Sequence, residues 1–174
     1  MNHPHGKPLI SRDGLRAICE AAAASPWHVG VHCVGDAGID AVLDAFEAAE
    51  RVQSIADRRW TLIYMMYPRA DHWSRARKLR LSVTAQQPLQ FSLAGGFQHY
   101  IGPERARDIE PLRGDLAEIA RPVGGGSDSP VAPFAPLFGI QSSVTRMTRA
   151  AGVVGPEWAI TVPEAVRMYT ESSA

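Results

Sequence analysis

Two polar residues of this chain stand where apolar, strand-like runs end: His32 in VGVHCVGD and Asp128 in VGGGSDSPV. An imidazole and a carboxylate are both good ligands for a divalent metal such as zinc, and a carboxylate beside a water molecule can also take its proton. Each residue also has a structural interpretation, because a strand-end histidine is often only a satisfied structural residue and Asp128 suits a turn or a helix cap. The residue types therefore leave a metal or acid–base site and a structural role both open.

A third apolar run, WTLIYMMYP, carries Tyr64 where such a site would want another ligand. A phenol with a pKa of about 10 is a poor zinc ligand at neutral pH, although it can donate a hydrogen bond to an oxyanion. His99, in a Gly-rich and aromatic stretch, and Arg146, in SVTRMT, are candidate substrate contacts. For Arg146, a surface or salt-bridged role is the alternative.

The elements that must position these residues follow a repeating pattern. Four apolar runs predict strands, VGVHCV, WTLIYMM, LSVTAQ and RPVGG, and helical periodicity predicts helices over 11–24, 36–51, 70–80, 110–120, 136–147 and 162–171. The stretch 89–107 is expected to be an irregular loop at a strand end, where a substrate loop would lie. Strands that alternate with helices predict an α/β fold with a parallel sheet.

Length limits how much of a barrel the chain can form. At 174 residues it is one domain, whereas a complete (β/α)8 barrel needs about 250 residues. We therefore predict a single truncated domain, 1–174, with about four parallel βα units of a TIM-type barrel. In such a barrel the chemistry lies at the carboxyl ends of the strands, so His32 and Asp128 should lie on one rim.

Composition excludes several classes of function. Eighteen basic and eighteen acidic residues cancel, and the one basic run, RARKLR, fits a solvated helix face, so no nucleic-acid partner is indicated. No stretch approaches the roughly 18 apolar residues of a membrane span, and the amino terminus lacks a secretory signal. We expect a cytoplasmic protein without a membrane partner. Its two cysteines should be reduced, with Cys33 more suited to apolar packing than to chemistry.

Four segments together resemble a known family: HCVGDAGIDAVLDAFEAA, RWTLIYMMYPRADHWSRARKLRLSVTAQQP, GGGSDSPVAPFAPL and PEAVRMYT. They are similar to the C-terminal half of the barrel in the amidohydrolase superfamily. The resemblance is to its amidohydrolase 3 group, which includes exoenzyme-regulatory-protein-like hydrolases and N-substituted formamide deformylases. It runs through nearly the whole chain and implies a metal-dependent hydrolase of C–N bonds in small, non-peptide amide-type substrates.

The resemblance also implies a ligand set. Family members hold a divalent metal, usually zinc, with an HxH pair on the first strand, a carboxylated lysine or an acid on the fourth, histidines on the fifth and sixth, and an aspartate on the eighth. By motif, His32 matches the fifth-strand histidine, and Asp128 matches the aspartate that activates water and passes its proton to the leaving nitrogen. Tyr64 stands at the sixth-strand histidine position, and the first four strands have no counterpart. His3 and His5 have the letters of HxH but no strand to aim them.

Three hypotheses remain open for the function. The chain is a hydrolase that is weak or inactive alone because ligands are missing, or a catalytically dead fragment that serves as a binding or scaffold domain. A third hypothesis is an obligate oligomer, because a four-stranded half-barrel exposes unpaired strand edges and apolar surface. Its partner would be a second copy or a complementary N-terminal half-barrel.

Overall fold

The computed structural model describes residues 7–174 and contains one sheet of four parallel strands. The strands follow chain order across the sheet: β1 (Gly30–Cys33), β2 (Thr61–Tyr64), β3 (Ser82–Ala85) and β4 (Val123–Gly125). The strands pair in register, with Gly30 opposite Thr61, Thr61 opposite Ser82, and Val83 opposite Val123. The predicted α/β fold with four parallel strands is therefore confirmed, and within the described chain β1 and β4 are the open edges of the sheet.

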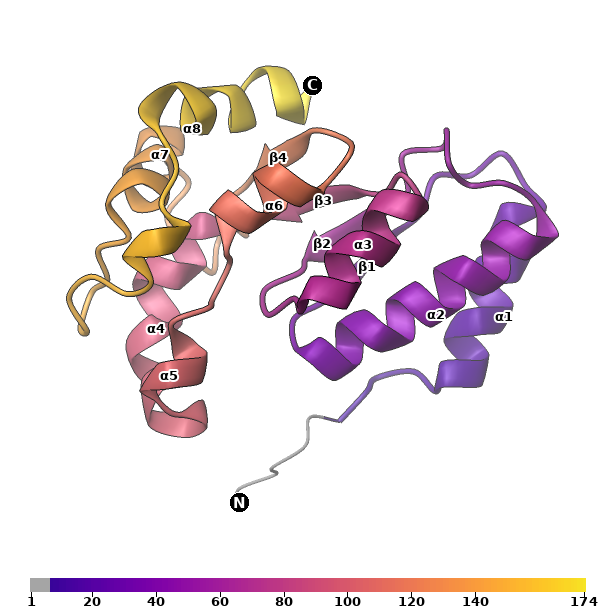
Figure 1. The fold of residues 1–174 in the computed structure, drawn as a ribbon, viewed down its shortest axis with the longest axis horizontal. Helices are drawn as coiled ribbons and strands as arrows, with labels where there is room; N and C mark the ends of the chain where they lie inside the picture. The colour runs from indigo at the N-terminus through magenta and orange to yellow at the C-terminus, as the bar shows by residue number, and fades with distance from the viewer. Residues whose placement is uncertain (1–6) are drawn as a thin grey trace.

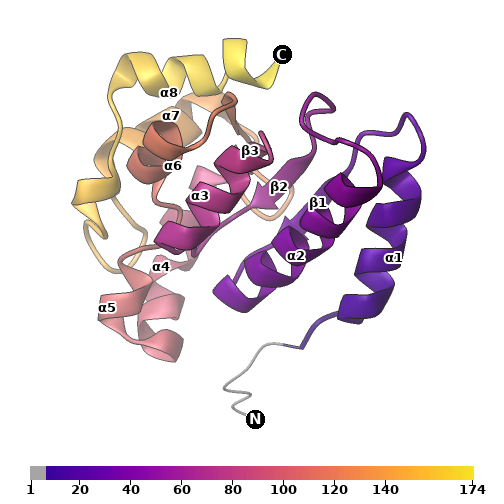
Figure 2. The same cartoon turned by 45° about the vertical axis from the view of Figure 1, so that its right-hand side comes forward.

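The helices form two groups. Helix α1 (Arg12–Ala23) precedes the sheet, and α2 (Asp36–Val52) and α3 (Ala70–Lys78) follow β1 and β2. After β3 come α4 (Gln87–Ile101), α5 (Pro103–Ala106) and α6 (Leu112–Glu118), and after β4 come α7 (Pro136–Thr145), α8 (Val162–Met168) and the short turns η1 (Pro156–Trp158) and η2 (Glu171–Ser173). Figures 1 and 2 show α2 and α3 covering one face of the sheet with α1 outside α2, while α4, α5, α7 and α8 form the second group.

Local signals explain where several of these helices begin. The Ser11 hydroxyl accepts a hydrogen bond from the Gly14 amide at the start of α1. At α8, Thr161 and Glu164 form a reciprocal capping box. Such caps satisfy amides that have no partner inside the helix, and both starts lie within one residue of the starts predicted from periodicity.

The expectation of an irregular loop over 89–107 is wrong. Most of that stretch is the helix α4, which has Pro88 in its first turn. Two consecutive glycines in its middle weaken the helical signal, because glycine costs about 1 kcal/mol relative to alanine in a helix. Gly95 packs closely on Ala150, in the segment after α7, since a Cβ at Gly95 would lie 3.3 Å from the Cβ of Ala150. Tertiary packing therefore stabilises a helix that local propensity does not predict.

Two buried clusters hold the fold together. The larger packs α1–α3 on the sheet, extends to α6 and α8, and includes Phe46, Trp60 and Leu62, all fully buried. The Trp60 ring packs edge-on against Phe46 at 4.9 Å, and its indole nitrogen donates to the Trp27 carbonyl at 3.2 Å. The smaller cluster lies at the carboxyl ends of the strands and contains Tyr64 among its buried residues.

The other face of the sheet is open and lines a cavity of about 740 Å³. Alternate strand residues face this cavity, among them Thr61, Ile63, Ser82 and Thr84, as the two-residue period of a strand requires. In a closed barrel this face would be the interior. Within residues 7–174, no helix combines the length and apolar character needed to cross a membrane.

Candidate functional site

The carboxyl ends of the strands bring His32, Tyr64 and Asp128 together. The His32 ring lies edge-on to the Tyr64 ring, with centroids 4.7 Å apart. The Asp128 carboxylate lies near enough to the Tyr64 hydroxyl to raise its pKa. His32 is exposed, Asp128 half-buried and Tyr64 buried, so the three form a rim that is open on the His32 side.

An unusual backbone conformation puts Tyr64 in this position. The register pairs Cys33 with Tyr64 and His32 with Ile63, so regular strands would send His32 and Tyr64 to opposite faces. Tyr64 and Met65 instead adopt positive φ angles of 77° and 47°, in a region that residues with side chains rarely occupy. These angles interrupt the alternation at the end of β2, and the Tyr64 ring lies against His32.

Tyr64 is a neutral hydrogen-bond donor at physiological pH. Burial raises the pKa of its hydroxyl to about 12, and the negative charges of Asp128 and Glu110 add to the effect. A phenol that keeps its proton is a poor metal ligand but can donate to the Asp128 carboxylate. Tyr64 therefore stands beside His32 as a protonated phenol whose pKa responds to Asp128.

The described residues do not complete a catalytic metal site at this rim. A catalytic zinc ion usually has three protein ligands, and His32 and Asp128 would supply two. Among residues 7–174, the one group of three His, Cys, Asp or Glu side chains whose ligand atoms lie close together does not include either of them. His3 and His5, which have the letters of the HxH pair, lie outside the described residues.

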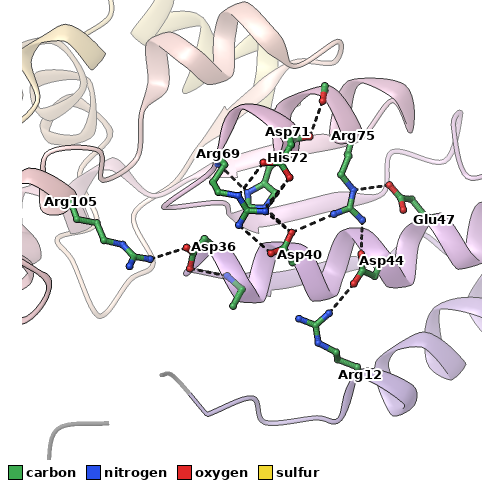
Figure 3. A network of polar contacts seen from close by, with 12 residues as sticks. Arg12, Asp36, Asp40, Asp44, Glu47, Arg69, Asp71, His72, Arg75 and Arg105 are labelled. Atoms are coloured by element: carbon green, nitrogen blue, oxygen red, sulfur yellow. Dashed lines mark hydrogen bonds and ion pairs between the residues drawn. The ribbon is translucent and has the colours of Figure 1, made fainter. Parts of the chain in front are cut away.

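That group is Asp40, Asp71 and His72, whose ligand atoms lie within 4.8 Å of one another between α2 and α3. Figure 3 shows that guanidinium groups already engage both carboxylates. Arg69 contacts Asp40 through two nitrogens at 2.9 and 3.1 Å and Asp71 at 3.0 Å, and Arg75 reaches Asp40 at 3.5 Å. A metal ion would compete with these cations, so the donor set fits an ion-pair network that joins the two helices.

The remaining predicted site residues lie away from the rim. His99 is exposed in the last turn of α4, where its ring packs on Tyr100. Arg146 is fully buried, and its guanidinium donates to the backbone carbonyls of Val154, Glu110 and Ile109 at 2.7 to 3.1 Å. The alternative of a surface or salt-bridged Arg146 is therefore wrong, because the side chain is buried and its partners are backbone carbonyls. The substrate contacts proposed for both residues stay predictions.

Sequence reasoning missed a group of buried polar residues near the rim. Six buried side-chain atoms have no hydrogen-bond partner in the described part of the chain, and all six belong to what we call the polar cluster: Tyr67, Gln86, Gln87, Gln90 and Glu110. An unpaired buried polar group costs about 1–3 kcal/mol, so folded proteins contain few of them. The only signal in the sequence was the pair Gln86–Gln87 at the end of a strand.

Glu110 connects the members of the polar cluster. Its Oε1 accepts from the Gln86 amide at 3.1 Å, and its own amide donates to the carbonyl of Met66, next to Tyr67, at 2.8 Å. Through Arg146 it is also joined to Gln90, whose Nε2 donates to the Arg146 carbonyl at 3.1 Å. Burial raises the Glu110 pKa to about 8, although the nearby Arg146 charge opposes this shift. Glu110 is therefore largely protonated at neutral pH.

Relatives in sequence cover nearly all of this chain. An N-substituted formamide deformylase from Arthrobacter pascens is 29% identical over 170 residues, which are 97% of this chain and 31% of the relative. YtcJ of Bacillus subtilis (strain 168), named as a candidate amidohydrolase, is 29% identical over 174 residues. The match covers 98% of this chain and 32% of YtcJ. The chain thus spans about a third of the length of the curated relatives it matches.

Solved structures agree with the sequence relatives. A structure from Pyrococcus furiosus, described as an uncharacterized metal-dependent hydrolase, superposes with a TM-score of 0.79 at 28% identity. The superposition covers 97% of this chain and 33% of the Pyrococcus chain, which is consistent with a partial barrel. The sequence model of the amidohydrolase 3 group, described as the amidohydrolase family, matches residues 1–174. The resemblance expected from the sequence is thus confirmed, and this chain belongs to the amidohydrolase family.

Proposed function

We propose that this chain supplies the C-terminal part of a metal-dependent hydrolase for C–N bonds of small, non-peptide amides. In this role His32 is one metal ligand, and Asp128 is a second ligand and the group that accepts a proton from the attacking water. The chain alone is weakly active or inactive, because its described residues supply two ligands where a catalytic zinc needs three. The metal is zinc by family resemblance, and the amide substrate follows the activity for which the Arthrobacter relative is named.

The observation that carries this proposal is the meeting of His32 and Asp128 around Tyr64 at the carboxyl edge of the sheet. Parallel barrels bind substrates at that edge, where residues from several strands converge. Family membership over residues 1–174 and the metal-dependent hydrolase fold of the Pyrococcus structure support the same assignment. The remaining ligands would come from a complementary N-terminal half-barrel.

A second candidate is a binding or scaffold domain without catalysis. Tyr64 favours it, because a buried, protonated phenol stands where the family has a histidine. The open edges β1 and β4 favour an assembly that pairs them, either with a second copy or with a complementary half. The two candidates differ in whether restoring one ligand restores metal binding.

Zinc binding to the purified chain tests the proposal directly. We expect the wild-type chain to hold no stoichiometric zinc after dialysis and the Tyr64→His variant to gain affinity, because histidine adds an imidazole beside His32. The gain should disappear in the double variant Tyr64→His/His32→Ala. Val52→His, at an exposed position at the end of α2, is the matched control and should bind no more zinc than wild type.

Two results would contradict the proposal. Zinc that binds equally well to Tyr64→His with and without His32 would place the metal elsewhere. A Tyr64→His variant that folds like wild type but gains no zinc would favour the scaffold role. Hydrolysis of N-substituted formamides, followed by release of the amine, then measures whether a zinc-loaded variant has any activity.

A further inference from the structure

The two open edges of the sheet differ in what lies beside them. In β4, the Gly126 amide donates to the Ala85 carbonyl of β3 at 2.9 Å, so the neighbouring Gly125 directs its own N–H and C=O away from β3. The Gly125 amide is nevertheless paired, because it donates to the Ser173 hydroxyl at 3.2 Å. The η2 turn, which contains Ser173, therefore takes the place that a further strand would occupy.

The η2 turn also packs on the face of β4 that lines the open cavity. Its residues Glu171, Ser172 and Ser173 line this cavity together with Gly124. A Cβ at Gly124 would lie 3.2 Å from the Ser173 Oγ and 3.6 Å from the Ser172 carbonyl oxygen, so a side chain there would crowd the turn. Figure 1 shows this yellow segment passing over β4. Glycine at position 124 thus allows η2 to lie directly on the strand.

Few contacts hold η2, and helix α8 does not depend on them. Ser173 is exposed, and besides accepting from Gly125 its hydroxyl donates to the Met168 carbonyl at 2.6 Å. Tyr169, just before the turn, is anchored separately. Its hydroxyl donates to the Gly126 carbonyl at 3.1 Å, and its ring would lie 2.7 Å from a Cβ at Gly125. A turn with exposed contacts opens at small cost, so η2 can leave β4 while α8 stays in place.

The edge of β1 has no such cover in the described part of the chain. The carbonyls of Val29 and Cys33 accept hydrogen bonds from β2, so Gly30 and His32 direct their backbone groups away from β2. Within residues 7–174 these groups have no backbone partner, and both residues are exposed. A bare edge of this kind pairs readily with another strand, which is why proteins usually cover or charge their edges.

The bare edge and the covered edge fit each other. All four strands are parallel and follow the order β1-β2-β3-β4, so the β1 strand of a second copy could extend the sheet beyond β4 in the same direction. In two copies related by a twofold axis, each β4 edge meets a β1 edge at the same time, and no edge is left open. A second copy is therefore the partner that suits the edges of this chain once η2 has left β4.

We propose that the η2 turn keeps this chain monomeric by covering the β4 edge, and that the β1 strand of a second copy pairs with this edge when the turn is displaced. Any other strand that adds to β4, including one from a complementary half-barrel, has to displace the turn in the same way. The turn is thus a competitor for the edge. The inference concerns assembly and does not depend on the proposed hydrolase function.

Amide hydrogen exchange, followed by nuclear magnetic resonance, tests whether the turn covers β4. We expect the Gly125 amide of the wild-type chain to exchange more slowly than the amides of Gly30 and His32, which have no partner. Ser173→Ala removes the acceptor and should speed exchange at Gly125 about fivefold, because one hydrogen bond contributes only modestly to stability. Ser172→Ala is the matched control, since it leaves the Ser173 hydroxyl in place, and should leave the Gly125 rate unchanged.

Sedimentation velocity measures the assembly. We expect the wild-type chain to sediment as a monomer and a shortened chain that ends at Thr170, without the η2 turn, to form a dimer. His32→Pro in the shortened chain should abolish the dimer, because proline removes an outward N–H of β1 and is tolerated on edge strands. Gly124→Val in the 174-residue chain is a second way to displace the turn, since its side chain would meet Ser173, and should give the same dimer.

Four results would overturn the inference. They are a wild-type chain that is already dimeric, a Gly125 exchange rate that Ser173→Ala leaves unchanged, a folded shortened chain that stays monomeric, and a dimer that persists with His32→Pro. The last result would place the contact on another surface. Circular dichroism identifies variants that do not fold. Ser173→Ala removes only one hydroxyl and should fold, so the exchange experiment decides the question even if the shortened chain does not.

Discussion

Replacing Glu110 by glutamine should make the chain more stable by an amount that grows with pH. Burial raises the Glu110 pKa from 4.5 to about 8, so the folded state resists its ionisation. Below pH 4.5 the carboxyl group is protonated in both the folded and the unfolded state, so its ionisation costs the fold nothing. As the pH rises to about 8, the unfolded state ionises first and the free energy of unfolding decreases. At about 1.4 kcal/mol for each pKa unit, the loss is at most about 5 kcal/mol.

Glutamine keeps the contacts of the neutral form without the ionisation. Its side-chain oxygen can accept from the Gln86 amide as the Glu110 Oε1 does at 3.1 Å. The free energy of unfolding of Glu110→Gln should therefore equal that of wild type near pH 4.5 and exceed it by several kcal/mol above pH 8. Asp115, buried and with a pKa raised to about 7, destabilises both proteins at high pH, and its charge adds to the raised Glu110 pKa, so it enlarges the expected difference.

Urea unfolding followed by tryptophan fluorescence, repeated across this pH range, measures the difference. Glu104→Gln, on the exposed surface of α5, is the matched control and should show a difference that does not change with pH. A stability difference for Glu110→Gln that stays constant from pH 4.5 to 9 would refute the reasoning. It would mean that the Glu110 carboxyl group ionises in the folded chain as easily as in the unfolded one.

The other predictions concern the helix network, the packing of one glycine and the two thiols. Hydrogen bonds from Arg69 lower the Asp40 pKa to about 2, so the ionised Asp40 stabilises the fold above pH 4, and this stabilisation is lost as the pH falls to about 2. In Asp40→Asn the free energy of unfolding should therefore fall by about 1 kcal/mol less than in wild type over this acid range, after allowance for solvent screening. A Cβ at Gly114 would lie 2.5 Å from the Trp73 ring, so Gly114→Ala should lower the free energy of unfolding by about 1–3 kcal/mol, whereas Gly96→Ala, with open space in α4, should raise it by up to about 1 kcal/mol. Burial raises the pKa of the Cys33 thiol to about 12 and of the Cys19 thiol to about 11, so neither should react with a disulfide reagent until the chain unfolds, and rapid labelling of the native protein would contradict this assignment.

The fold was predictable because each βα unit carries its own signals. Apolar runs located all four strands, and helical periodicity located helices such as α1 and α8. The helix α4 was not predictable, since Gly95 and Gly96 reduce its propensity and packing against α7 and Ala150 compensates only in the folded chain. Local patterns describe this chain well wherever tertiary contacts do not override them.

The site was predictable in part. His32 lies near the end of β1 and Asp128 follows β4, and parallel strands end at one edge, so the placement of both at this edge follows from topology. The contact of Tyr64 with His32 depends on two successive positive φ angles, which no residue type at those positions predicts. The polar cluster was out of reach, because Glu110 lies 24 residues from Gln86 and only the packed chain brings them together.

The strict chain order of the sheet has a consequence for how the domain forms. Each strand pairs with the strand before it, at partners such as Gly30 and Thr61 or Val83 and Val123, so every pairing closes a loop of only about 20 to 40 residues. The entropy cost of closing a loop rises slowly with its length, and no strand has to be inserted between two others. Such a sheet can grow by one strand and its helix at a time during synthesis. A barrel with this strand order can also be cut between two successive strands, and every other strand pairing inside each part is kept.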